Sequence, residues 1–438
     1  MSSGMQTQGL RLEQAPPLGI PLSFFLTAPV GIAAAGALLA YFGSALLATR
    51  IASATAAWVH LGTLGFIGCV MLGALYQMIP VVAGAAVPGV RSARLVHVFF
   101  VAGIAGLVLG LLTGSQRVLA SGALALTLAL TLFIAPVSIA LWRAPTKTPT
   151  VLGMAVATAG LAGVVCLGGA MALARSGTVS VAQYPFWMQV HLGFGFIVWI
   201  GGLIVSVSFQ VVPMFYLAPA LQQRTQRLLV AMVLCTLCGL GVGIAAGAGS
   251  TPIALAAAPG AVTIWCVHPL LTLDSLRKRR RKRADPSLWF WRAGLLAGLA
   301  AGAMGAAALL GDDPRLALSF GWLVLWGWAG SIVHGMLTRI VPFLVWFHRF
   351  SSLVGLVTVP PMRKLLPERL TQLAFVAHSA TLGLGLLAIA SQHSVLARLT
   401  GAALMVTAVL LLAQLLVTIR HRAPSLPAGS DHAPQPQS

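Results

Sequence analysis

Long apolar stretches, separated by short polar connections, follow one another along nearly the whole chain. A helix of about twenty residues crosses the hydrocarbon core of a bilayer, so stretches of this length predict transmembrane helices. Apolar residues make up 58% of the chain and charged residues 8%, a composition that excludes a water-soluble globular domain of this size. We expect an all-α polytopic membrane protein with twelve spans, over residues 21–48, 57–83, 93–114, 118–142, 150–174, 187–213, 226–249, 251–273, 289–311, 317–345, 370–391 and 396–419.

The net charge of +20 does not indicate nucleic-acid binding, because the basic residues gather in short connections between the apolar stretches. Connections rich in arginine and lysine alternate with connections that are poor in them, and positive charge marks the cytoplasmic side. The richest connection contains residues 277–283, all of them basic. The pattern predicts a bacterial-type inner membrane protein with both termini in the cytoplasm. Its expected parts are a cytoplasmic N-terminal segment (1–20), a membrane domain (21–422) and a disordered cytoplasmic tail (423–438).

An internal repeat relates the second, sixth and tenth spans. The second and sixth spans each carry a histidine near the start and end in Gln-x-x-Pro, and the tenth ends in a related Arg-x-x-Pro. These closing elements are Gln77-Met-Ile-Pro80, Gln210-Val-Val-Pro213 and Arg339-Ile-Val-Pro342. The repeat predicts three pseudo-symmetric four-helix units whose second, sixth and tenth spans meet around a common centre.

Four histidines within the spans are candidate ligands, because an ionisable side chain inside a membrane is costly unless it has a partner or a function. His60 and His191 hold matching positions at the head of two repeated motifs, so we expect both to bind a metal or a haem iron. His334 and His268 are secondary candidates for metal binding. A structural hydrogen bond is the alternative for each of them.

Gly62 and Gly65 leave one surface of the second span without side chains, close to His60. A bare surface would let a flat macrocycle lie against the backbone. The alternative is close helix–helix packing, which small residues permit in membranes. The neighbouring histidine favours the first interpretation.

The two histidine motifs then show a family resemblance. The first contains His60, Gly62, Gly65-Phe66, Tyr76 and Pro80; the second contains Trp187, His191, Gly195-Phe196, Val212 and Pro213. They resemble helices of the catalytic subunit I of haem-copper oxidases, particularly the C-type enzymes. The resemblance implies one or two b-type haems on His60 and His191, with Gly62, Gly65 and Trp187 as further cofactor contacts. It also implies contact with membrane lipid and an electron partner, either a small membrane subunit or a cytochrome c-type protein.

The sequence also departs from that family. The adjacent histidine pair that its seventh helix carries for copper is missing from residues 226–249, and its tenth-helix His-x-His is replaced by Ser319-Phe-Gly-Trp-Leu. Most ligands for copper and for a high-spin haem are therefore absent, so copper is the less favoured metal. We do not expect a terminal oxidase.

Three functions remain open. The first is haem-based electron transfer or haem-linked sensing without a dinuclear centre, either as an oxidoreductase or as an electron-transfer component. The second is a nitric-oxide response, because the twelve-span arrangement is also similar, more distantly, to NnrS-like membrane haem proteins. The third is transport of a metal or of haem, with which proline-broken helix ends are compatible.

Overall fold

The computed structural model describes residues 16–177, 183–247, 249–280 and 285–423. Within these residues the chain is helical, and twelve helical segments are long and apolar enough to cross a membrane. The predicted all-α fold and its twelve spans are confirmed. Eleven spans agree with the prediction to within four residues at each end, and the tenth continues eight residues further, to Leu353. The predicted tail, apart from residue 423, and most of the predicted N-terminal segment lie outside the described residues.

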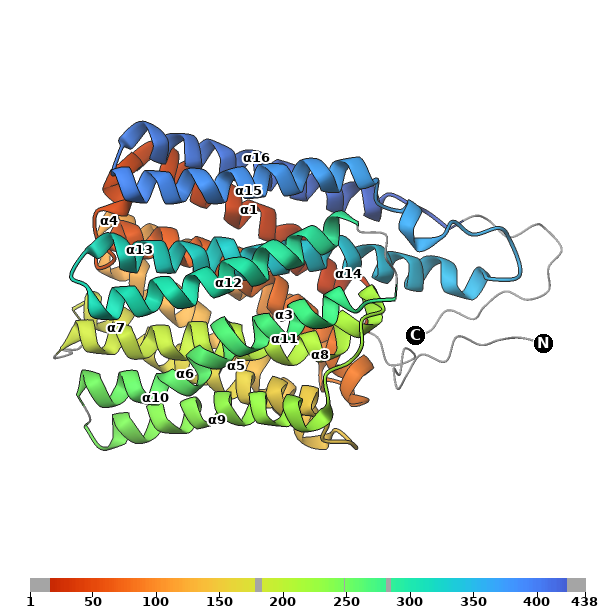
Figure 1. Cartoon of the computed structure of the whole chain (residues 1–438), viewed down its shortest axis with the longest axis horizontal. Coiled ribbons are helices and arrows are strands. Elements are labelled where there is room, and N and C mark those ends of the chain that lie inside the picture. Colours follow the sequence, from red (N-terminus) through yellow and green to blue (C-terminus); the bar gives the residue numbers. More distant parts are fainter. Residues whose placement is uncertain (1–15, 178–182, 248, 281–284, 424–438) are drawn as a thin grey trace.

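The twelve spans lie side by side, mostly along one direction (Figure 1). In chain order their elements are α1 (Gly19–Phe42) with η2 (Gly43–Leu47); α2 (Ser53–His60), η3 (Leu61–Gly68), α3 (Cys69–Met78) and η4 (Ile79–Ala83); η5 (Val90–Ser92) with α4 (Ala93–Thr113); α5 (Gln116–Arg143); α6 (Pro149–Arg175); α7 (Tyr184–Leu192), η6 (Gly193–Gly201) and α8 (Gly202–Tyr216); α9 (Gln223–Ala245); α10 (Ser250–Val262), η7 (Thr263–Val267) and α11 (His268–Arg277); α12 (Pro286–Leu310); α13 (Pro314–Trp322), η8 (Leu323–Gly330), α14 (Ser331–Phe350) and η9 (Ser351–Leu353); α15 (Glu368–Ser391); and α16 (Ser394–Ile419).

The second, sixth and tenth spans form the centre of the bundle. Some 83% of the apolar stretch of the second and sixth spans is buried inside the protein, and 61% of that of the tenth, against 28% for the ninth. Within these three spans, η3 and η6 both pack against η8. The common centre expected from the repeat is therefore observed, while the grouping of all twelve helices into three superimposable units stays a prediction.

Each central span changes from α-helix to π-helix and back. The π-helical segments η3, η6 and η8 begin within two residues of His60, His191 and Trp322, respectively. A π-turn holds an extra residue and shifts the side chains around it, and such turns are frequent at functional sites. The three matching positions thus carry two imidazoles and one indole at the same point of the repeat.

Residues next to Pro80, Pro213 and Pro342 line one small pocket, so the three proline closures lie together in one half of the bundle, which we call the closure half. Arg339 there forms an ion pair with Asp285, the residue that caps α12, and its Nε donates to Ser287 Oγ at 2.8 Å. These contacts connect the ninth and tenth spans. We call the opposite half, which contains His60 and His191, the cavity half.

Candidate functional site

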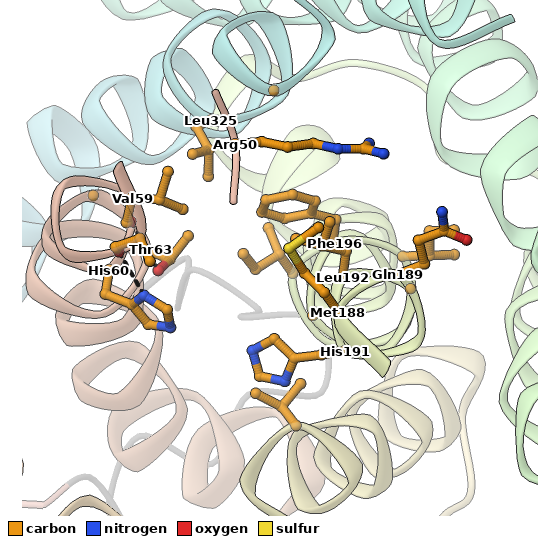
Figure 2. A pocket seen from close by; sticks show the side chains of 18 of the residues that line it. Arg50, Val59, His60, Thr63, Met188, Gln189, His191, Leu192, Phe196 and Leu325 are labelled. Carbon is orange, nitrogen blue, oxygen red and sulfur yellow. Dashed lines mark hydrogen bonds between the residues drawn. The ribbon is translucent and has the colours of Figure 1, made fainter. Parts of the chain in front are cut away.

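A large cavity opens within the cavity half of the bundle, with a volume of about 1110 Å³. Its walls come from both central histidine motifs and from the spans around them, and they are mostly apolar. His60, His191, Phe196 and Leu325 face this space (Figure 2). Ligand pockets in proteins commonly measure about 300–1,000 Å³, so this cavity is slightly larger than that range and is big enough for a sizeable ligand.

His60 is held in one orientation by its own helix. It is the last residue of α2, and its Nδ1 donates a hydrogen bond to the carbonyl oxygen of Ala56 at 2.7 Å. With the proton on Nδ1, Nε2 keeps its lone pair and lies on the cavity side. A backbone carbonyl bonded to the second ring nitrogen is the usual support of a metal-binding histidine.

His191 faces His60 from the opposite wall. The two ring centres are 6.4 Å apart, the ring planes differ by 31°, and each ring turns a nitrogen toward the other (Figure 2). Gly168 of α6 makes room for the second ring, because a methyl group at Gly168 would lie 3.1 Å from Cε1 of His191. Nδ1 of His191 is buried without a hydrogen-bond partner among the described residues. Two imidazoles in this arrangement can bind one metal ion from opposite sides.

The two glycines predicted as cofactor contacts have different surroundings. Gly62 lines the cavity, and a methyl group added there would meet no atom within 4 Å. Gly65 instead packs against α1, where a methyl group would lie 3.0 Å from the Cα atom of Gly31. The predicted bare surface therefore exists at Gly62, whereas Gly65 serves the alternative that the sequence also allowed, close helix packing.

The other predicted site residues do not join this pair. Trp187 is outside the cavity lining, and its ring packs against Phe186 with centres 5.2 Å apart. His334 is buried and shares a hydrogen bond with Gln414 at 3.0 Å; His268 is buried and shares one with Ser208 at 2.8 Å. Neither lines the cavity. Among the described residues, no three histidine, cysteine or acidic side chains gather where they could hold a metal ion.

Three polar side chains of the cavity wall were not predicted as site residues from the sequence. Arg50, Arg175 and Tyr184 line the cavity. Both arginines belong to connections that are poor in basic residues, so only their rarity there could have singled them out. Arg50 extends across the cavity and has no hydrogen bond or ion pair with a described residue (Figure 2). Arg175, by contrast, donates three hydrogen bonds.

Aromatic rings continue from the cavity wall into the bundle. Trp58 stacks on Trp322 with ring centres 5.7 Å apart, Trp322 on Trp326 at 6.0 Å, and Trp326 on His378 at 4.3 Å. The planes within each pair differ by less than 20°. Large stacked rings make this side of the cavity stiff, because each indole is fixed by its neighbours.

A comparison with models of known protein families finds no match for this chain, and a search of curated proteins finds no significant relative.

Proposed function

We propose that this integral membrane protein binds a b-type haem between His60 and His191. The observation that supports the proposal most strongly is the spacing of the two facing imidazoles. Two imidazoles on opposite faces of one metal, with metal–nitrogen bonds of about 2.0 Å, have ring centres about 6 Å apart. The 6.4 Å between His60 and His191 agrees with that value.

The surroundings favour a macrocycle over a bare metal ion. A bound zinc ion needs about four ligands, and no third histidine, cysteine or carboxylate gathers with the pair within the described residues. The cavity of about 1110 Å³ exceeds what a single ion requires. Gly62 leaves open space beside His60, and Gly168 of α6 leaves room for the His191 ring. A haem would supply its own four equatorial nitrogens and need only two axial ligands from the protein.

Two imidazoles would fill both axial positions of such a haem, an arrangement suited to one-electron transfer. We therefore favour an electron-transfer or haem-linked sensing role, with a cytochrome c-type protein or a small membrane subunit as the electron partner that the family resemblance implies. A nitric-oxide response of the NnrS type is the alternative, and metal or haem transport is the third. The cavity residues that bind would be His60, His191 and Gly62.

Haem and metal analysis of the purified protein tests this proposal. We expect one haem per chain and no stoichiometric copper. His60→Ala should lose most of the haem, because the better supported ligand is removed, whereas His393→Ala should keep it, since His393 is exposed at the start of α16. A colourless protein with bound copper or zinc would overturn the proposal and favour metal handling.

The orientation in the membrane is part of the proposal. The alternation of basic connections supports an orientation with the cavity half on the outer side of a bacterial inner membrane and both termini inside. Lys278→Cys and Asp312→Cys provide matched exposed positions at the two ends of the bundle. In intact cells a membrane-impermeant thiol reagent should label the cysteine at 312 and spare the one at 278; the reverse pattern would invert the topology.

A further inference from the structure

The two histidines of the cavity are not supported equally. His60 Nδ1 donates to Ala56 O within the same helix at 2.7 Å, so the orientation of its ring is fixed relative to α2. His191 Nδ1 has no partner among the described residues, and its ring is bounded on one side by Gly168. A missing hydrogen bond at the second ring nitrogen commonly weakens metal binding about 10–100-fold. His191 must therefore be held opposite His60 by its helix rather than by its own ring contacts.

One side chain connects the two helices that carry the histidines. Arg175, at the end of α6, donates from Nη1 to Oγ of Ser53, the first residue of α2, at 2.5 Å. Its Nη2 donates to the carbonyl oxygen of Ile51, two residues before α2, at 2.9 Å. Its Nε donates to the hydroxyl of Tyr184, the first residue of α7, at 2.7 Å. The guanidinium carbon also lies 5.0 Å from the centre of the Tyr184 ring.

The contacts of Arg175 on α2 and on α7 are equally far along the helix from the two histidines. Ser53 precedes His60 by seven residues, and Tyr184 precedes His191 by the same number. Seven residues are about two helical turns, so each contact lies on the same face of its helix as the histidine, about 10 Å away along the axis. Arg175 thus joins the two histidine faces at equal heights and sets how far apart the two helices stand.

We propose that Arg175 is a positioning residue that keeps His191 opposite His60. We also propose that a small uncharged ligand displaces His191, and not His60, from the haem iron. The inference rests on the proposed haem. The size of the ligand follows from the wall at the His191 ring, where Gly168 contributes neither a side chain nor a charge. Carbon monoxide is a suitable probe of this class.

Carbon monoxide binding to the reduced protein, followed optically together with the low-spin fraction and the haem content, tests the inference. In Arg175→Gln the three hydrogen bonds to Ser53, Ile51 and Tyr184 are weakened or lost. We expect the haem to stay on His60, the low-spin fraction to fall and carbon monoxide to bind at least about 10-fold faster. Arg175→Lys, which keeps the charge but not the fork of donors, should restore only part of the wild-type behaviour.

Arg117→Gln is the control, because Arg117 is exposed at the start of α5 and does not line the cavity. It should bind carbon monoxide within about twofold of the wild-type rate, since no contact between the two histidine helices is lost. Arg50→Gln removes a charge of the cavity wall without a helix contact. Equal acceleration in Arg50→Gln and Arg175→Gln would show that cavity charge, not helix spacing, matters, and would overturn the inference.

Tyr184→Phe keeps the test decisive if Arg175→Gln fails to fold. It removes one of the three hydrogen bonds and should shift the rate in the same direction by a smaller factor. Unchanged kinetics in Tyr184→Phe, with haem present, would reject the role of Arg175 and leave the proposed haem intact. A wild-type protein without haem would instead reject both.

Discussion

Two pairs of histidines lie at similar separations in this bundle and have different environments. The ring centres of His60 and His191 are 6.4 Å apart in the cavity half, and those of His334 and His378 are 5.5 Å apart deeper in the bundle. The first pair is only partly buried and faces open space; the second is at most 1% exposed. The ring of Phe290 packs against both members of the second pair.

Hydrogen bonding separates the pairs further. In the deeper pair, Nε2 of His334 shares a hydrogen bond with Gln414, and Nε2 of His378 is within 3.1 Å of Ser331 Oγ and the Trp326 carbonyl oxygen. In the cavity pair, only the Nδ1 atom of His60 has such a partner, and the nitrogens that face the cavity remain available. His334 and His378 each also keep one nitrogen, Nδ1, without a partner among the described residues, but Phe290 packs against both rings. Proximity of two imidazoles and a free nitrogen therefore do not define a ligand site; open space between the rings does.

Replacement of a deeper histidine should lower the stability of the protein without changing its haem content. We expect His378→Ala to lower the free energy of unfolding by about 1–3 kcal/mol, because Ser331 and Trp326 lose a buried partner. The haem content per chain should stay at the wild-type level, in contrast to His60→Ala, which should lose most of it. The measurement is thermal unfolding in detergent together with the haem-to-protein ratio. Loss of haem from the folded His378→Ala protein would place a ligand in the deeper pair.

Gly65 and Gly62 provide a second contrast within η3. A methyl group at Gly65 meets the backbone of Gly31, which cannot turn away, so Gly65→Ala should destabilise the protein by about 1–3 kcal/mol. Gly62→Ala adds the same group in open cavity space and should leave the unfolding temperature near the wild-type value. Equal destabilisation by the two substitutions would mean that the wall around Gly62 is packed rather than open.

The smallest expected effect concerns Gly168 and its neighbour. In Gly168→Ala the new methyl group would press on His191 Cε1 at 3.1 Å, so the ring must shift by a few tenths of an ångström. In Gly169→Ala the nearest atom is Thr127 Oγ1 at 3.6 Å, an ordinary contact. We expect a change in the low-spin spectrum for Gly168→Ala alone. Identical spectra for the wild type and both variants would show that His191 is not constrained at that wall.

The sequence predicted the spans well because hydrophobic length is a local property. The repeat also singled out His60 and His191 as the first candidates, and the structure brings these two rings together. His334 and His268 were secondary candidates, but their hydrogen-bond partners Gln414 and Ser208 could not be predicted, because they are 80 and 60 residues away along the chain.

Two further features could not be read from the sequence. Gly62 and Gly65 are three residues apart in one helix, and only the position of α1 decides which of them meets a neighbour. In the sequence Arg175 is one arginine in a short connection, and only the structure shows its contacts near the starts of α2 and α7. Both depend on contacts between segments that are distant in the chain.

The optical and electron paramagnetic resonance spectra of the purified wild-type protein test the central claim most directly, that His60 and His191 bind one haem iron from opposite sides. The account predicts a sharp α-band on reduction and a low-spin ferric signal of a haem with two imidazole ligands, both altered in His191→Ala. A protein without haem, or a haem that is high-spin in the wild type and unaffected by His191→Ala, would contradict it.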